Sequence, residues 1–595
     1  MLILKSSYSI GYAGVNLYSK YFPILEWLKS YTYTDFTDDS VAAVIVTIML
    51  IPQSLAYAML AGLPPEMGLY ASIIPLILYA IFGTSKTLAV GPVAVIALMT
   101  SASCSQFANP GSAEYVVLAV VLAIMSGIML ITMGLLKLGF VANFLSHPVI
   151  SGFITASGLI IAASQLNHIF GIEGRGSNLL DILLNLISNL THLNPYTLVI
   201  GVFALSILFW CKKRLKQFML NLGVSPLTSD VVSRTGPVIA VVLTTTMVWV
   251  FGLGANKVAI VGRIPDGLPS LGFPSFSFSI WAELLAPALL ITLVGYVETV
   301  SVAQTLASKR RQRIDPNQEL IALGFSNVGS GISGGFPVTG GFARSVVNFD
   351  AGAKTPAAGA FTAIGIALAT VFLTPLLFYL PKATLAATII IAVLSLVDFK
   401  SVQKTFSYSR PDGLAMTCTI FVTLLMGVEI GIISGVGISL LMYLYRTSRP
   451  HIARVGQVPG TQHFRNVNRH LVITSERVIS LRIDESLYFP NARFLEDTIY
   501  GYVGREPEIN DVILVFSAIN YLDASALESL ESINRRLADA KVNLHFSEVK
   551  GPVMDQLQRT NFLAELSGQV FLSQFEAFKT LEPDLAEGSS TFNRV

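Results

Sequence analysis

Apolar runs separated by short polar loops occupy the first three quarters of the chain. The clear runs begin near Val41, Gly68, Glu114, Pro148, Pro195, Gly236, Trp281, Pro356, Ala383, Gly413 and Glu429. A helix needs about 20 apolar residues to cross the hydrocarbon core of a bilayer, and shorter runs are typical of broken or buried helices. The pattern therefore predicts a helical membrane domain with about a dozen candidate spans over residues 41–450, preceded by an N-terminal segment, residues 1–40.

Charge and periodicity both change near residue 450. Residues 1–450 carry 43 charged side chains, whereas the 145 residues from 451 to 595 carry 33, which is the density of a soluble domain. From about Val472, strand patterns (VISLRID, DVILVFSAI and VNLHFS) alternate with helical patterns (NARFLEDTIYGYV and DASALESLESINRRLADA). This alternation predicts a small α/β domain within residues 451–595.

Composition excludes several classes of protein. The chain is 53% hydrophobic and 13% charged, with a mean hydropathy of +0.64, which excludes a soluble enzyme, a disordered scaffold and a nucleic-acid-binding protein. The sequence has no GxxxxGKS or GxxxxGKT loop and no HExxH motif, so it favours neither an ATP-driven pump nor an enzyme of the HExxH class. Its three cysteines lie far apart and fit buried thiols, so neither a metal site nor a cofactor is expected.

Basic residues gather in particular loops and thereby indicate the orientation. Clusters lie at 212–216, 309–313, 400–410 and 446–449, whereas the loops at 106–112 and 268–279 carry no Lys or Arg. Loops rich in Lys and Arg stay on the cytoplasmic side of a membrane. We therefore expect both termini, including residues 1–40, to be cytoplasmic in a multi-pass protein of the cell (inner or plasma) membrane.

Two short segments break the pattern of long runs. Residues 84–102 (TSKTLAVGPVAVIALMTSA) and 331–350 (GISGGFPVTGGFARSVVNFD) each place a Gly/Pro-marked approach before an apolar run that is too short to span a bilayer. Paired interrupted segments indicate half-helices at a midplane site in an inverted repeat. Two half-helix N-termini that face each other would bind an anion through unpaired N–H groups and positive dipole ends. The alternative is that these glycines and prolines are tolerated kinks.

Two ionisable residues lie at the expected depth of the membrane. Arg344 follows the TGGFA run and Glu298 lies in LLITLVGYVETVSVAQTL, where each unpaired charge costs at least about 2.5 kcal/mol. Arg344 would add a fixed positive charge to the anion site, and Glu298 would serve as a proton carrier. The alternative is an ion pair between them that fixes two helices. Gln53 and Tyr57 share a helical face, where they could hydrogen-bond an oxyanion or serve only helix packing.

Two long motifs resemble those of a known family. The block IPQSLAYAMLAGLPPEMGLYASIIPLILYAIFGTSKTLAVGPVAVIALM resembles the signature of sulfate permease (SulP) transporters, relatives of the solute carrier 26-type anion exchangers, and GGFPVTGGFARSVVNFDAGAKTPAAG resembles the matching segment of the second repeat. The resemblance covers essentially the whole chain. It implies an α-helical membrane protein with 14 transmembrane helices in two inverted 7-helix repeats, divided into core and gate domains. It also implies a cytoplasmic STAS domain after residue 450 and a homodimer.

The resemblance also implies roles for individual residues. Anion binding carries over to Gln53, Tyr57, Val93, Ala94, Gly341, Phe342, Ala343 and Arg344. Glu298 matches a carboxylate linked to proton coupling, and prestin-like exchangers have a serine where this chain has Ala343. Ser525 aligns with the serine that is phosphorylated in anti-sigma-factor antagonists, and this resemblance makes it a candidate regulatory residue. With Glu528, Ser525 also fits a capping box.

These inferences favour secondary active uptake of a small inorganic anion by alternating access, with sulfate coupled to protons as the leading form. Bicarbonate uptake driven by sodium as the coupling ion, or proton-driven dicarboxylate uptake, stays open on the same scaffold. A membrane-anchored sensor that signals through the STAS domain is the alternative of another class. The expected partners are the anion, the lipid bilayer, a second copy of the chain and a cytoplasmic regulator of the STAS domain, but no nucleic acid.

Overall fold

The computed structural model describes residues 21–144, 146–172, 174, 176, 178–225, 229, 232–233, 235–263, 267–269, 271–274 and 278–588. Residues 1–20 of the predicted N-terminal segment lie outside these ranges. The chain divides into two compact units, Met1–Ser439 and Leu440–Val595.

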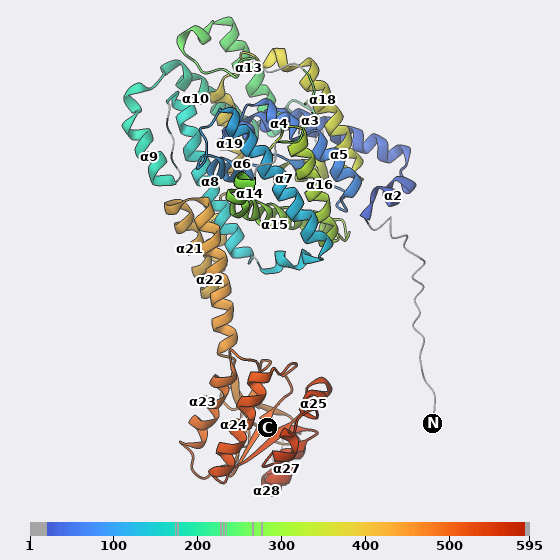
Figure 1. The fold of residues 1–595 in the computed structure, drawn as a ribbon, viewed down its shortest axis with the longest axis vertical. Coiled ribbons are helices and arrows are strands. Elements are labelled where there is room, and N and C mark those ends of the chain that lie inside the picture. The colour runs from blue at the N-terminus through green and yellow to red at the C-terminus, as the bar shows by residue number, and fades with distance from the viewer. Residues whose placement is uncertain are drawn as a thin grey trace. The chain divides into compact units, whose positions relative to one another are not determined.

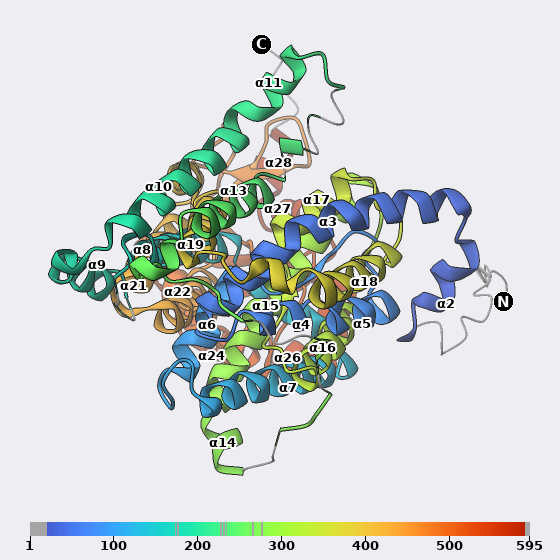
Figure 2. The ribbon, with the colours of Figure 1, turned by 90° about the horizontal axis from the view of Figure 1, so that it is seen from above.

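The first unit is built from helices, which Figures 1 and 2 show, and it also contains two very short strands. Its elements are α2 (Ile24–Trp27), α3 (Tyr33–Leu60), α4 (Glu66–Tyr70), α5 (Ile74–Phe82), β1 (Val90–Gly91), α6 (Ala94–Cys104), α7 (Ala113–Leu135), α8 (His147–Phe170), α9 (Leu179–Ser188), α10 (Pro195–Trp210), α11 (Lys216–Asn221), α13 (Gly236–Val250), α14 (Phe278–Glu283), α15 (Leu285–Lys309), α16 (Pro316–Ile332), β2 (Thr339–Gly340), α17 (Phe342–Asp350), α18 (Ala357–Phe372), α19 (Lys382–Val393), α20 (Phe399–Tyr408), α21 (Arg410–Met426) and the start of α22 (Val428–Ser448). Every predicted apolar run begins within or at the start of one of these helices.

Several of these helices are long enough to cross a bilayer. Within the described residues, six segments have the required length and apolar composition: α3, α7, α8, α15, α22 and the segment Pro195–Asn221, which joins α10 to α11. Shorter apolar helices, such as α6, α13, α18 and α19, accompany them. The total of fourteen transmembrane helices stays a prediction.

The first long helix begins earlier than its apolar run. The run starts at Val41, but α3 starts at Tyr33 because Thr32 and Asp35 form a reciprocal capping box. The Thr32 hydroxyl accepts a hydrogen bond from the N–H of Asp35 at 3.2 Å, and the Asp35 carboxylate accepts one from the N–H of Thr32 at 2.9 Å. Such a cap satisfies N–H groups that would otherwise be unpaired. The helix therefore includes polar residues that precede the apolar run.

One group of helices packs around α7 and α16, which lie side by side in both views (Figures 1 and 2). A Cβ added at Gly127 would lie 2.7 Å from the carbonyl oxygen of Gly324, and a Cβ added at Gly324 would lie 2.8 Å from that of Gly127. Small residues are what permits two membrane helices to approach this closely. The group also includes α3, α4, α5, α6, α15, α17 and α18.

A second group of helices consists of α8, α10, α13, α19 and α21. Its apolar contacts include Ile169 of α8, Ala204 of α10, Ala240 of α13 and Ala386 of α19. The two groups meet where α3 contacts α13 and α19, and where α6 contacts α8. This division into two helix groups corresponds to the predicted core and gate domains.

The second unit contains a six-stranded sheet with the strand order β4-β3-β5-β6-β7-β8. Its elements are β3 (Ile452–Gln457), β4 (Phe464–Asn466), β5 (Val478–Ile483), α23 (Ala492–Val503), β6 (Asp511–Val515), α24 (Ala524–Asp539), β7 (Asn543–Ser547), α25 (Gly551–Leu557), α26 (Phe562–Glu565), β8 (Val570–Phe571), α27 (Gln574–Leu581) and α28 (Pro583–Gly588). The strands from β5 to β8 are parallel, and β3 is antiparallel to both β4 and β5. The three predicted strands and two predicted helices are confirmed.

Helices cover both faces of this sheet. Val512 and Leu514 of β6 belong to the apolar cluster that includes α23 and α24, whereas Ile513 packs with Ala577 of α27. Successive side chains of a strand point to opposite faces, so a strand buried on both sides reads as a continuous apolar run. The sequence DVILV of β6 is such a run.

The predicted capping box at Ser525 is wrong. Helix α24 begins at Ala524, and its cap is Asp523, whose carboxylate accepts a hydrogen bond from the N–H of Ala526 at 2.8 Å. Aspartate caps a helix as well as serine does, so the helix can begin directly after Asp523, two residues before Ser525. Ser525 lies in the first turn of α24 with an exposed side chain. Its regulatory role stays a prediction.

Candidate functional site

Two short helices begin next to each other in the interior of the first unit. Helix α6 follows strand β1, and helix α17 follows strand β2. The two strands form an antiparallel pair, with Val90 opposite Gly340 and Gly91 opposite Thr339. The two interrupted segments are far apart in the sequence, and the structure brings them together as the pattern predicts.

Neither short helix has a side chain that caps its N-terminus. Val93 precedes α6 and Gly341 precedes α17, and neither side chain accepts a hydrogen bond from the first turn. By contrast, Thr32, Ser112 and Asp315 cap α3, α7 and α16. First-turn N–H groups carry the positive end of the helix dipole. Two uncapped helix starts in a buried location therefore form a site that suits an anion.

The guanidinium of Arg344 lies between these helix starts. Arg344 is 3% exposed, and its Nη2 donates a hydrogen bond to the carbonyl oxygen of Pro92. Its Nη1 is buried and has no hydrogen-bond partner among the described residues. A buried cationic donor without a partner is costly unless a ligand satisfies it. The site thus holds a free positive donor where the sequence predicts an anion.

Glycines leave room for this guanidinium. A Cβ added at Gly341 would lie 2.6 Å from Nε of Arg344, and a Cβ added at Gly91 would collide with Nη1. Arg344 therefore keeps its position only while both neighbours lack a side chain.

Tyr57 and Glu298 lie within electrostatic range of Arg344. Glu298 lines a small cavity of about 20 Å³ together with Val95 of α6, and the other lining residues are apolar. A cavity of this size holds about one water molecule. Within the part of the chain that the structure describes, no ion pair joins Glu298 to Arg344. The alternative of a fixed ion pair between them is therefore not seen.

The other predicted site residues divide by exposure. Gln53 lies one turn before Tyr57 on α3, and both are buried with no side-chain hydrogen bond to another described residue. Val93, Ala94 and Gly341 are buried at the two helix starts. Phe342 and Ala343 are exposed in the first turn of α17. Which of these eight residues contact an anion stays a prediction.

Several polar residues position the two helix starts, and the sequence analysis did not identify them. The hydroxyl groups of Thr299 and Thr339 share a hydrogen bond at 2.7 Å, and Thr299 also accepts one from the N–H of Gly340 at 3.0 Å. Asn327 of α16 donates to the carbonyl of Val338 and accepts from its N–H, both at 2.9 Å. The signal in the sequence that could have identified these positioning residues is a polar residue inside an otherwise apolar run.

Helix α17 is also joined to the segment that precedes β1. The hydroxyl of Ser345 accepts a hydrogen bond from the N–H of Ala89 at 3.0 Å, and the side-chain amide of Asn348 donates to the carbonyl of Thr87 at 3.0 Å. These bonds fix the second half-helix to the approach of the first, so both helix starts keep one relative position.

Two buried carboxylates hold the loops beside the short helices. Glu319 of α16 accepts hydrogen bonds from the hydroxyl of Tyr79 at 2.7 Å and from the N–H of Thr84, before β1, at 2.9 Å. Asp39 of α3 accepts from the hydroxyl of Thr355, after α17, at 2.5 Å. Both carboxylates are completely buried. Since their oxygens are occupied by these donors, we interpret Glu319 and Asp39 as anchors.

Comparison with known proteins places this geometry in a family. Residues 36–419 match the sulfate permease family, and residues 471–577 match the STAS domain. The chain is 36% identical over 561 residues to "Sulfate transporter 4.1, chloroplastic" of Arabidopsis thaliana, which covers 92% of this chain and 80% of that protein. It is 31% identical over 589 residues to "High affinity sulfate transporter 2" of Stylosanthes hamata, which covers 95% of this chain and 87% of that protein.

Solved structures share the fold. The murine Solute Carrier 26 family member A9 anion transporter, in the inward-facing state, matches with a TM-score of 0.86 at 23% identity, covering 98% of this chain and 97% of that chain. The transmembrane domain of a cyanobacterium bicarbonate transporter, BicA, matches with a TM-score of 0.58 at 23% identity, covering 68% of this chain and 99% of that chain. The fold is thus a helical membrane body followed by a STAS domain.

Proposed function

Because this chain belongs to the sulfate permease family, a family of membrane transporters and not of enzymes, we propose that it is a secondary active transporter that takes up sulfate together with protons. The names of the two plant relatives support sulfate as the anion, since the chain resembles them over most of their length.

The positive charge of the site matches a divalent anion, and this observation carries the proposal. Arg344 supplies one full charge, and each of the two uncapped helix starts supplies about half an elementary charge. Together these groups balance the two negative charges of sulfate. The unpaired Nη1 of Arg344 and the first-turn N–H groups would donate hydrogen bonds to its oxygens.

Protonation of Glu298 changes the net charge of this site. When Glu298 is ionised, its negative charge beside Arg344 offsets about half of the positive charge of the site. When it is protonated, the full positive charge is available to sulfate. Protonation and binding of a divalent anion therefore favour each other. The small cavity beside Glu298 has room for about one water molecule that could deliver the proton.

The two helix groups support alternating access. Gln53, Tyr57, Glu298 and Arg344 all lie on helices of the first group. The cavity beside Glu298 is closed by residues of α8 and α22, including Phe153. A rigid-body movement between the groups would open the site to one side of the membrane and close it to the other.

The proposal also includes the orientation of the chain in the membrane, its oligomeric state and its regulation. The basic loops support cytoplasmic termini in the cell (inner or plasma) membrane. Family membership supports a homodimer, and the exposed side chain of Ser525 leaves it accessible to a cytoplasmic regulator.

Uptake of labelled sulfate into proteoliposomes tests this function. With acid outside, each unit of pH difference should raise the accumulation ratio about tenfold for each coupled proton. Unlabelled sulfate should compete, whereas bicarbonate, chloride and succinate should compete weakly.

Other outcomes would support the alternatives. Uptake driven by a sodium gradient, with bicarbonate as the strongest competitor, would support the sodium-driven alternative. Strong competition by succinate would support dicarboxylate uptake. Uptake that survives deletion of residues after about 455 would count against the sensor, whose membrane domain would bind the anion without translocating it.

Replacing Gly341 with alanine should lower sulfate uptake about tenfold, because the new Cβ would displace the guanidinium of Arg344. The melting temperature should stay nearly unchanged, since the strain is confined to one side chain. Initial uptake rates and thermal unfolding of the same preparation measure both effects. Gly437→Ala in α22, where an added Cβ meets nothing within 4 Å, is the matched control. Equal uptake by Gly341→Ala and Gly437→Ala would contradict the assigned position of Arg344.

A further inference from the structure

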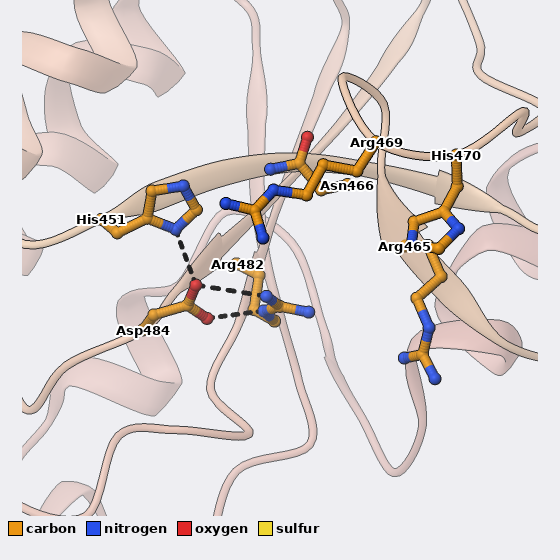
Figure 3. Close-up of a pocket in the computed structure, with 7 residues that line it drawn as sticks. All are labelled: His451, Arg465, Asn466, Arg469, His470, Arg482 and Asp484. Carbon is orange, nitrogen blue, oxygen red and sulfur yellow. Dashed lines mark hydrogen bonds and ion pairs between the residues drawn. The ribbon is translucent and has the colours of Figure 1, made fainter. Parts of the chain in front are cut away.

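A pocket in the STAS domain collects basic side chains (Figure 3). It has a volume of about 380 Å³ and is lined by His451, Arg465, Asn466, Arg469, His470, Arg482 and Asp484. These residues lie on or beside β4, β3 and β5, which are neighbours at one edge of the sheet. The pocket is separate from the site around Arg344, because all its residues belong to the second unit.

Asp484 is the one carboxylate among the lining residues, and its charge is already balanced. Arg482 donates a hydrogen bond to it from Nε at 2.6 Å, and Nδ1 of His451 lies 2.8 Å from its other oxygen. Burial opposes ionisation of Asp484, but the hydrogen bonds from Arg482 and His451 outweigh it and hold the pKa of this carboxyl below its usual range. Asp484 is therefore ionised at neutral pH and occupied by these two partners.

The remaining basic side chains of the pocket lack such a partner. Within the described chain, Arg465, Arg469 and His470 form no ion pair with a carboxylate. Figure 3 shows Arg469 beside Arg482 and Asn466, whereas Arg465 and His470 lie at the other end of the pocket. This excess contrasts with the domain as a whole, because residues 451–595 hold 19 Asp and Glu side chains and only 14 Lys and Arg side chains. Cations gathered in a concave surface repel one another, and a bound anion removes that repulsion.

We propose that this pocket binds a phosphate-bearing anion with two or more negative charges. Guanidinium groups present paired N–H donors that match phosphate oxygens, and the amide of Asn466 can add a neutral donor. The volume of about 380 Å³ falls within the range of small-molecule sites, about 300–1,000 Å³.

Two sources can supply this chemistry: a soluble phosphate compound or the headgroup of a phosphorylated lipid. His451 follows Ser448, the last residue of α22, by three positions, so the chain keeps the pocket within about 10 Å of the end of an apolar helix that is long enough to cross a membrane. A lipid headgroup is therefore within reach as well as a soluble anion.

Binding of labelled pyrophosphate to the full-length protein in phosphatidylcholine nanodiscs tests the proposal. The wild-type chain should bind pyrophosphate saturably, and Arg465→Gln/Arg469→Gln should weaken the affinity at least about tenfold. Both arginines are exposed and neither bonds another side chain, so the double variant should fold normally. Arg535→Gln/Arg559→Gln makes the same charge change at exposed positions outside the pocket and should bind as the wild type does.

A second arm separates the two sources of phosphate. If the source is a lipid, adding phosphatidylinositol 4,5-bisphosphate to the nanodisc should weaken pyrophosphate binding in the wild type. If the source is soluble, inositol hexakisphosphate should compete and the lipid should not. The variant Arg344→Gln should still bind pyrophosphate, which separates this pocket from the transport site. Absence of saturable binding, or equal binding by the two double variants, would overturn the proposal.

Discussion

Replacing Arg344 with glutamine is expected to lower sulfate uptake about 10- to 100-fold. The change removes the full positive charge of Arg344 from between the two helix starts, whose partial charges stay. A hydrogen bond to a charged group contributes about 1.5–3 kcal/mol, which corresponds to this loss of affinity. Initial rates of labelled sulfate uptake in proteoliposomes, measured at a fixed pH gradient over a range of sulfate concentrations, give the effect on affinity.

Two further variants test whether the effect depends on the guanidinium group and on the position of residue 344. Arg344→Lys keeps the charge but loses the paired N–H donors, so we expect its uptake to lie between those of the wild type and Arg344→Gln. Arg313→Gln makes the same charge change at an exposed position just before α16 and should transport normally. Thermal unfolding of each variant separates loss of binding from loss of folding. Normal uptake by Arg344→Gln would remove Arg344 from the anion site.

Replacing Glu298 with glutamine is expected to uncouple sulfate uptake from the pH gradient. Glutamine has the shape of a protonated glutamate, so the site would keep its full positive charge at every pH and still bind sulfate. In the wild type, each unit of pH difference should change the accumulation ratio about tenfold for each coupled proton. In Glu298→Gln the ratio should stay near one, while exchange of internal for external sulfate continues. Uptake with and without the gradient measures the difference.

Glu429 offers a matched control for this experiment. It lies in the first turn of α22, where it accepts a hydrogen bond from the hydroxyl of Ser103 at 2.9 Å. Because Glu429 is partnered and is not among the groups that interact with Arg344, Glu429→Gln should keep the response to the pH gradient. If Glu298→Gln keeps the full response as well, Glu298 serves only to hold α15 in place.

The features that the sequence predicts correctly are those that depend on neighbouring residues. A glycine- and proline-marked approach to a short apolar run is local, and it located both α6 and α17. The alternation of apolar strands with amphipathic helices located β5, β6, β7, α23 and α24 in the same way. Period and turn chemistry determine such elements before any long-range contact forms.

The features that the sequence does not predict depend on contacts between distant residues. Thr299 and Asn327 act only because α15 and α16 bring them to β2. Strand β4 has only three residues, and β3 (IARVGQ) mixes polar with apolar residues, so neither strand stands out in the sequence. The basic pocket beside them therefore also escaped prediction. At α24, two residues could cap the helix, and only the backbone conformation at Asp523 decides between it and Ser525.

The two half-helices match in form but not in charge. The third residue of α17 is Arg344, whereas the third residue of α6 is Ile96. Related halves of opposite orientation would let an empty carrier face either side with equal ease, but the cation of Arg344, which has no counterpart in α6, removes that equivalence. We therefore expect the protein without bound anion to populate one access state more than the other. The side chain of Arg344 would determine which side of the membrane that state faces.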